Sequence, residues 1–89
     1  MARYYFDIYN RPQSIHDDEG SEFDSLDVAM QAAARSATEI GTCRLAKGDT
    51  RDVVIEVRDE QNQRVGTVTA SMKIEQHVSR PRGSHSWSA

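Results

Sequence analysis

Apolar and polar residues alternate in three stretches of the chain, and such alternation is typical of β-strands that bury one face. The stretches are RYYFDIYN (residues 3–10), RDVVIEVRDE (51–60) and VGTVTASMKIE (65–75). The residues predicted to face the core are Tyr4, Phe6 and Ile8, then Val53, Ile55 and Val57, then Val68, Ala70, Met72 and Ile74. The pattern therefore predicts three well-defined strands.

A fourth, weaker strand is predicted around residues 14–18, where Ile15 is the only apolar residue. The break before it comes from Pro12, which fixes φ and lacks a hydrogen-bond donor. Its charged residues predict a short edge strand that resists pairing with other chains. Gly20 then offers a turn or bulge, after which Phe23 returns to the core.

One helix is predicted from about residue 26 to residue 44. Asp24 and Ser25 are both good N-cap residues, and Asp27 falls in the first turn, where the helix dipole favours negative charge. Steps of three and four residues place one apolar stripe along it, made of Leu26, Ala29, Met30, Ala33, Ala37 and Ile40. Gly48 is a natural stop.

The order of elements is strand, strand, helix, strand, strand, with a hairpin loop at 60–63 in which Asn62 is expected to be left-handed. One layer of sheet with the helix on one face buries every apolar stripe. A right-handed crossover places the third strand beside the first. We therefore predict an α+β fold, a four-stranded antiparallel sheet of order 2-1-3-4 with one helix packed on one face.

Eighty-nine residues is the length of one small domain, whose stability is marginal and for which oligomers are common. Residues 1–76 are expected to form this single α+β domain. Residues 77–89 are polar, rich in Ser, and without periodicity, and they are expected to form a disordered tail that includes Trp87.

The formal net charge of −3 argues against a general binder of nucleic acid or acidic membranes, which needs a basic surface. The single cysteine, Cys43, has no partner for an internal disulfide and offers no zinc framework. No apolar run approaches the ~18 residues of a membrane span. We expect a cytoplasmic protein with no membrane contact.

The segments RYYFDIYN, DDEGSEFDSLDVAMQAA and RDVVIEVRDEQNQRV resemble a family of small bacterial proteins of unknown function. In that family an aromatic-aromatic-Asp opening strand precedes an Asp-x-x-Gly turn and an Ala-rich helix, and a Val-x-Val-x-Asp-Glu hairpin closes the domain. The resemblance covers about residues 3–75. It implies a fold of this type and no particular chemistry.

Six carboxylates are crowded just before the alanine-rich run of the helix, and they raise the question of a metal or catalytic site: Asp17, Asp18, Glu19, Glu22, Asp24 and Asp27. A calcium loop with Gly20 at its sixth position would need acids where Ile15 and Leu26 stand. The acids instead suit a charged edge, a turn and a helix N-terminus. His16 is interpreted as a surface residue, because neighbours in a strand point to opposite faces and His16 would not meet Asp17.

Cys43 lies near the helix C-terminus, which disfavours a thiolate, and it is interpreted as incidental. We therefore assign no catalytic, cofactor-binding or metal-binding residues, and we expect neither a cofactor nor enzymatic activity.

The sheet face away from the helix is the remaining candidate, a possible interaction surface made of Tyr5, Tyr9, Val54, Arg58, Thr67, Thr69 and Lys73. Aromatics and basic residues on an open sheet can stack RNA bases, but Asp7 and Glu56 at the centre of this face would repel phosphate. A half-solvated face or a dimer contact fits better. The leading hypothesis is a small non-enzymatic interaction module, a homodimer that contacts proteins.

The alternative hypothesis is an antitoxin-like regulator that binds a protein partner or nucleic acid. It draws on a weaker architectural likeness to HicB-type antitoxin domains, which also run strand, strand, helix, strand on one sheet. Likeness of fold is a poor guide to function.

Overall fold

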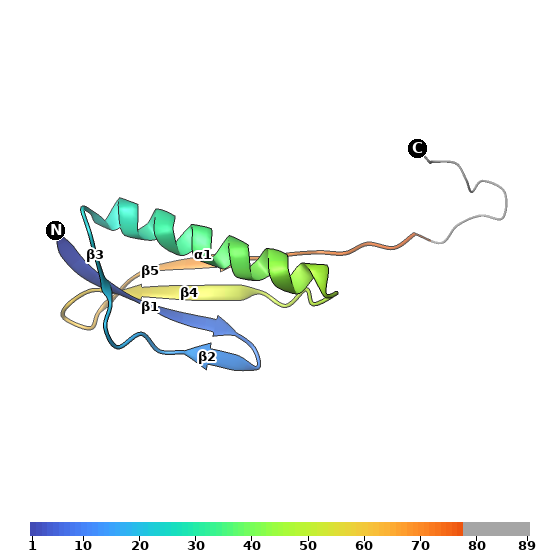
Figure 1. The fold of residues 1–89 in the computed structure, drawn as a ribbon, viewed down its shortest axis with the longest axis horizontal. Coiled ribbons are helices and arrows are strands. Elements are labelled where there is room, and N and C mark those ends of the chain that lie inside the picture. The colour runs from blue at the N-terminus through green and yellow to red at the C-terminus, as the bar shows by residue number, and fades with distance from the viewer. Residues whose placement is uncertain (78–89) are drawn as a thin grey trace.

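The computed structural model of the protein describes residues 1–77, and it shows one helix packed on one face of an antiparallel sheet (Figure 1). The elements are β1 (Ala2–Asn10), β2 (Gln13–Ile15), β3 (Ser21–Phe23), α1 (Leu26–Ala46), β4 (Val53–Arg58) and β5 (Arg64–Ala70). The main path of the sheet runs β2-β1-β4-β5. The α+β class, the antiparallel pairing and the predicted strand order are confirmed.

The number of strands is five, not four, because the weak strand predicted at 14–18 is replaced by two short ones. β2 pairs with the end of β1, as in Ile8 opposite Ile15, and β3 pairs with its beginning, as in Tyr4 opposite Ser21. Between β2 and β3 the chain leaves the sheet and turns at Gly20, where φ is +70°. The edge of β1 is thus covered in two pieces with a gap between them.

The core lies between α1 and the middle strands. Val53, Ile55 and Val57 on β4 are completely buried, and Tyr4, Phe6 and Ile8 of β1 pack around them, as the alternation predicted. The ring of Phe6 stacks on Phe23 with centroids 5.6 Å apart, so β3 contributes to the same core.

Small residues on α1 bring the helix close to the sheet. Ala29, Ala33, Ala37 and Gly41 recur every fourth residue, and all four are buried. Where the helix meets β5, Met30 occupies the space beside Gly66, and Met72 occupies the space beside Gly41. A side chain at either glycine would meet a thioether at less than 3 Å, so these glycines are sites of close approach.

Both ends of α1 are fixed by side chains. Ser25 is the N-cap, one of the two predicted candidates, and its Oγ accepts a hydrogen bond from the amide of Val28 at 3.2 Å. At the other end Arg44 donates to Asp49 and to the carbonyls of Asn10 and Arg11, which ties the helix to the turn after β1. The helix ends two residues later than predicted, and Gly48 follows with φ +84°.

The hairpin between β4 and β5 has the predicted left-handed residue, Asn62, at φ 65°. However, β5 ends at Ala70 instead of continuing to residue 75. The reason lies in the register, because Ala70 is opposite Val53, the first residue of β4, and no later residue has a partner there.

The predicted domain boundary at residue 76 and the predicted tail concern residues that lie at or outside the end of the described part of the chain. The disordered tail and Trp87 fall outside residues 1–77. Within those residues, no helix is long and apolar enough to cross a membrane.

The close contact between helix and sheet predicts that a larger side chain at Ala37 will destabilise the fold. Ala37→Leu adds three carbons where the side chain has no exposed surface, and overpacking of that kind typically costs ~1–3 kcal/mol. In a domain of this size ~1 kcal/mol corresponds to ~4–8 °C, so the melting temperature should fall by at least several degrees. Ala34→Leu, on the exposed side of α1, is the matched control and should change it little. Equal effects of the two substitutions in a thermal melt would contradict this packing.

Candidate interaction surface

The outer face, meaning the face of the sheet away from α1, is organised in rows of directly opposed residues. One row joins Tyr9, Val54 and Thr69, and a second joins Asp7, Glu56 and Thr67. Tyr5 lies opposite Arg58. The structure therefore brings six of the seven predicted surface residues onto one face, while Lys73 lies beyond the end of β5.

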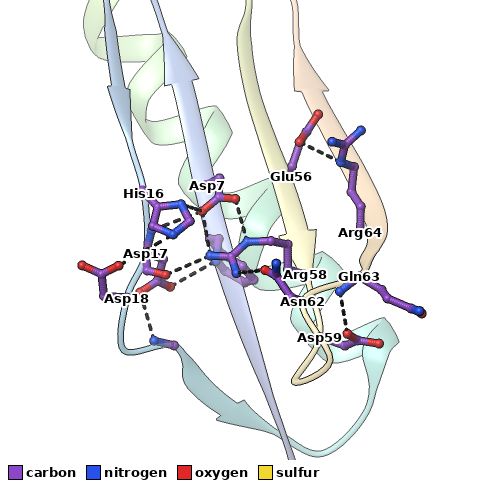
Figure 2. Close-up of polar contacts among 12 residues, drawn as sticks. Asp7, His16, Asp17, Asp18, Glu56, Arg58, Asp59, Asn62, Gln63 and Arg64 are labelled. Carbon is purple, nitrogen blue, oxygen red and sulfur yellow. Dashed lines mark hydrogen bonds and ion pairs between the residues drawn. The ribbon is translucent and has the colours of Figure 1, made fainter.

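Arg58 does not project freely from this face, because it is the centre of a polar network (Figure 2). Its Nε donates to Asp7 Oδ2 at 2.7 Å, and its Nη2 donates to Asp7 Oδ1 at 3.0 Å. The remaining donors reach the carbonyl of Asp17 at 2.9 Å and Oδ1 of Asn62 at 2.7 Å. The planar guanidinium thus joins β1, β4, the segment after β2 and the hairpin loop, which a lysine could not do.

Asp7 is the most deeply buried residue of β1, with 8% of its side chain exposed, although the sequence suggested a solvated acid. Besides the two bonds from Arg58, its carboxylate accepts the amide of Asp17 at 3.2 Å and lies 3.1 Å from Nδ1 of His16. Three of these four contacts are at Oδ1 and one is at Oδ2. Asp7 is therefore a structural anchor that joins β1 to β4 and to the segment after β2.

Burial of Asp7 opposes ionisation, but the hydrogen bonds from Arg58 and from the Asp17 amide outweigh it and lower the pKa of the carboxyl below 3.8. The pKa of Asp17 is also lowered, since three backbone amides outweigh the effect of its burial. Both groups are consequently charged at neutral pH, and their charge is balanced locally by Arg58.

Asp17 fills the gap between β2 and β3. Its Oδ2 accepts the amide of Phe6 at 3.0 Å, so the side chain takes the place of a strand partner for β1. Its Oδ1 accepts the amides of Glu19 and Gly20 at 3.2 and 2.9 Å, which closes the turn. The Asp-x-x-Gly spacing is thereby explained as one device that caps a strand edge and reverses the chain.

Tyr5 explains why the last residue of that turn is glycine. A Cβ on Gly20 would lie 2.8 Å from the ring of Tyr5 and 2.9 Å from the carbonyl of Tyr4. The other contact of the ring is with Arg58, whose Cζ lies 5.1 Å from the ring centroid. Tyr5 is thus held within the network and, like Arg58, is partly buried.

His16 meets Asp7 on the neighbouring strand, not Asp17 beside it in sequence. Its Nε2 also lies 3.7 Å from Asp18, and 66% of its side chain is exposed. Among residues 1–77, no three His, Cys, Asp or Glu side chains are arranged to hold a metal ion. Of the other acids in this group, Glu22 pairs with Arg3 at 3.3 Å, and Asp27 lies in the first turn of α1.

One accessible part of the outer face lies at the end of the sheet where β2 and β4 begin. Tyr9, 41% exposed, and Val54 lie there with Glu56 beside an open groove. The turn after β1 and the segment before β4 form the rest of its wall, with Arg11 and Arg51. Arg51 is already paired with Asp49.

The second accessible feature is the free edge of β5. Backbone groups of antiparallel strands alternate in direction, and the amide of Phe6 points away from β4, toward Asp17. Tyr5, Asp7 and Tyr9 must therefore be the β1 residues that bond to β4. Their partners on β4, which are Arg58, Glu56 and Val54, bond to β1. The intervening residues of β4, which are Val53, Ile55 and Val57, therefore bond to β5.

The residues of β5 opposite those intervening ones are Gly66, Val68 and Ala70. It follows that Thr67 and Thr69 direct their backbone N–H and C=O groups to the free edge. Between residues 1 and 77, β4 is the only strand that pairs with β5. Apart from Arg64 at its start, β5 carries no charge or proline, so this edge is not blunted from Val65 to Ala70.

Comparison with known proteins gives a single result. The sequence model of a family described as Domain of unknown function (DUF6894) matches residues 3–71. No curated protein and no solved structure matches the chain.

The buried network predicts strong coupling between Asp7 and Arg58. Asp7→Asn or Arg58→Gln alone leaves hydrogen-bonding groups of the other residue unpaired, and each should cost ~1–3 kcal/mol. The double variant should cost less than the sum of the two, with a coupling of ~0.5–3 kcal/mol in urea unfolding.

The matched control for this cycle is the pair Glu56 and Arg64, 3.0 Å apart on the same face but with 66% of the Arg64 side chain exposed. Its coupling should stay below ~1 kcal/mol. A coupling between Asp7 and Arg58 no larger than that of the control pair would show that the network does not stabilise the fold.

The lowered pKa values predict the acid dependence of stability. Because Asp7 and Asp17 have folded pKa values below the ordinary 3.8, their contribution is complete well above pH 3.8 and is lost as the pH falls below it. The free energy of unfolding, measured in urea from pH 7 to pH 2.5, should therefore decrease below about pH 4. Asp7→Asn should be less stable at pH 7 and lose less on acidification. Parallel curves for the two proteins would rule out this role for Asp7.

Proposed function

The chain belongs to the DUF6894 family, and we propose that it is a small, non-enzymatic interaction module of the bacterial cytoplasm that works as a homodimer. The observation that carries the proposal is the free edge of β5, where Thr67 and Thr69 direct unpaired backbone groups outward. Such an edge is a template for a further strand. A second copy of the chain offers a strand of matching length and composition.

The contrast between the two sides of the sheet supports this use of β5. At the other side, β1 is covered by β2, by β3 and by the carboxylate of Asp17, so its backbone is not offered to a partner. β5 has seven residues, whereas β2 and β3 have three each. The longest free edge is thus the one that lacks protection.

Pairing two β5 strands about a two-fold axis would continue the sheet from one copy into the other and place Thr67 and Thr69 of both on one surface. The core of this short domain is a single layer between one helix and the sheet, so further burial would add to a marginal stability. Face-to-face packing through Tyr9 and Val54 is the competing route to a dimer.

A HicB-like regulatory role is the alternative function, and it rests on architecture alone. The face that such a role would use for nucleic acid has its central arginine, Arg58, committed to Asp7. We therefore favour protein–protein contact.

The test is Thr69→Pro, which removes an amide that points to the free edge. Proline is tolerated at strand edges where no internal hydrogen bond is lost, so the fold should persist by circular dichroism. Sedimentation velocity at micromolar concentration should show a dimer for the parent and a monomer for Thr69→Pro.

Thr69→Ala is the matched control, because it changes the side chain and keeps the amide, and it should remain dimeric. A dimer that survives in Thr69→Pro but is lost in Tyr9→Ala would move the contact to the outer face. A parent that stays monomeric at high concentration would refute the homodimer.

A further inference from the structure

Residues 71–75, which we name the arm, keep the alternation of a strand after β5 has ended. Ser71, Lys73 and Glu75 are exposed, while Met72 is half-buried against Gly41 of α1. Ile74 lies on the same side as Met72 by this alternation, yet its side chain is 52% exposed. The arm thus has an apolar side and a polar side but no strand beside it in residues 1–77.

The arm continues in line with β5 and passes beyond the end of the sheet (Figure 1). In a strand conformation its backbone keeps the alternation of β5, so Ser71 and Lys73 direct their N–H and C=O groups to the same side as Thr67 and Thr69. The free edge of β5 and the arm therefore form one line of unpaired backbone groups that continues from Thr67 to Lys73.

We propose that two copies pair reciprocally through the arm: the arm of each runs antiparallel along the β5 edge of the other, with the two-fold axis at Ser71. This inference rests on the homodimer proposed above and specifies its register. Lys73 of one copy then lies opposite Thr69 of the second, and Glu75 opposite Thr67. On the helix side, Met72 lies opposite Ala70 and Ile74 opposite Val68.

The side chains favour this register over the two nearest registers that keep the same backbone hydrogen-bonding direction, which place the two-fold axis at Thr69 or at Lys73. With the axis at Thr69, Ile74 would lie level with Arg64, which is charged, exposed and directed to the outer face by its ion pair with Glu56, so Ile74 would have no apolar partner. With the axis at Lys73, two ammonium groups would face each other directly, which is destabilising. At Ser71 the helix-side pairs are all apolar, and the Lys73–Glu75 ion pair, at 2.7 Å, stays on the outer face.

The register is tested with single cysteines in the full chain, in which Cys43, exposed and free, is replaced by serine. A residue on the two-fold axis meets its own copy at ~5.5 Å between Cα atoms, which suits a disulfide. Cys43→Ser/Ser71→Cys should therefore give a covalent dimer on mild oxidation. Thr67→Cys in the same background is the control, since eight residues of strand, ~27 Å, would separate its two copies.

Ile74→Asp provides a second measurement that needs no cross-link. The substitution places a negative charge opposite Val68 of the second copy, and it should raise the dimer dissociation constant at least tenfold in sedimentation equilibrium. Gln76→Asp, which adds the same charge farther along the chain, should raise it less. An unchanged dissociation constant for Ile74→Asp would overturn the pairing through the arm.

The two proposals fail in different ways. Cross-linking at Thr67→Cys or Thr69→Cys, without cross-linking at Ser71→Cys, would overturn the register through the arm and keep an edge-paired dimer. A monomeric parent, with no cross-link at any of these positions, would overturn both.

Discussion

The salt bridge between Asp7 and Arg58 closes the outer face of the sheet, which no helix covers within residues 1–77. A single helix can bury only one face, so the other must be closed by side chains that tolerate water at their margins. The guanidinium reaches four acceptors, on β1, in the segment after β2 and in the hairpin, and Tyr5 lies against it. Burying two charges carries a desolvation cost that only a fully bonded pair offsets, and here nearly every donor and acceptor is used.

That network also determines how the first strand is finished. Arg58 holds the carbonyl of Asp17, and Asp17 in turn accepts the amide of Phe6, the one that falls in the gap between β2 and β3. Gly20 ends the same turn beneath the ring of Tyr5. The three features of the opening segments, aromatic pair, aspartate and Asp-x-x-Gly turn, are therefore parts of one arrangement. All three depend on Arg58, which follows Asp7 by 51 positions.

Local patterns predicted most of the fold, because alternation and the small-residue stripe report directly on burial. They placed the core residues of β1 and β4, the helix with its N-cap at Ser25 as one of two choices, the left-handed Asn62 and the strand order. They could not show that residues 13–23 contain two strands, since the hydrogen bond that replaces strand pairing comes from a side chain, that of Asp17. The length of β5 was also overestimated, because a strand ends where its partner ends, and alternation alone carries no information on the partner.

The outer face was interpreted least well for a related reason. Alternation alone predicts two separate surface charges at Asp7 and Arg58, although their strands place them diagonally opposite each other, where long side chains meet. A register derived from the hairpin and the crossover would have revealed the pair. Because these two residues bond to each other within the network, their charges are not offered as a docking site on the outer face. The parts that remain open to a partner are the row from Tyr9 to Thr69 and the backbone of β5 and the arm. A second copy of the chain carries the same backbone edge, so two copies related by a two-fold axis can pair these edges antiparallel.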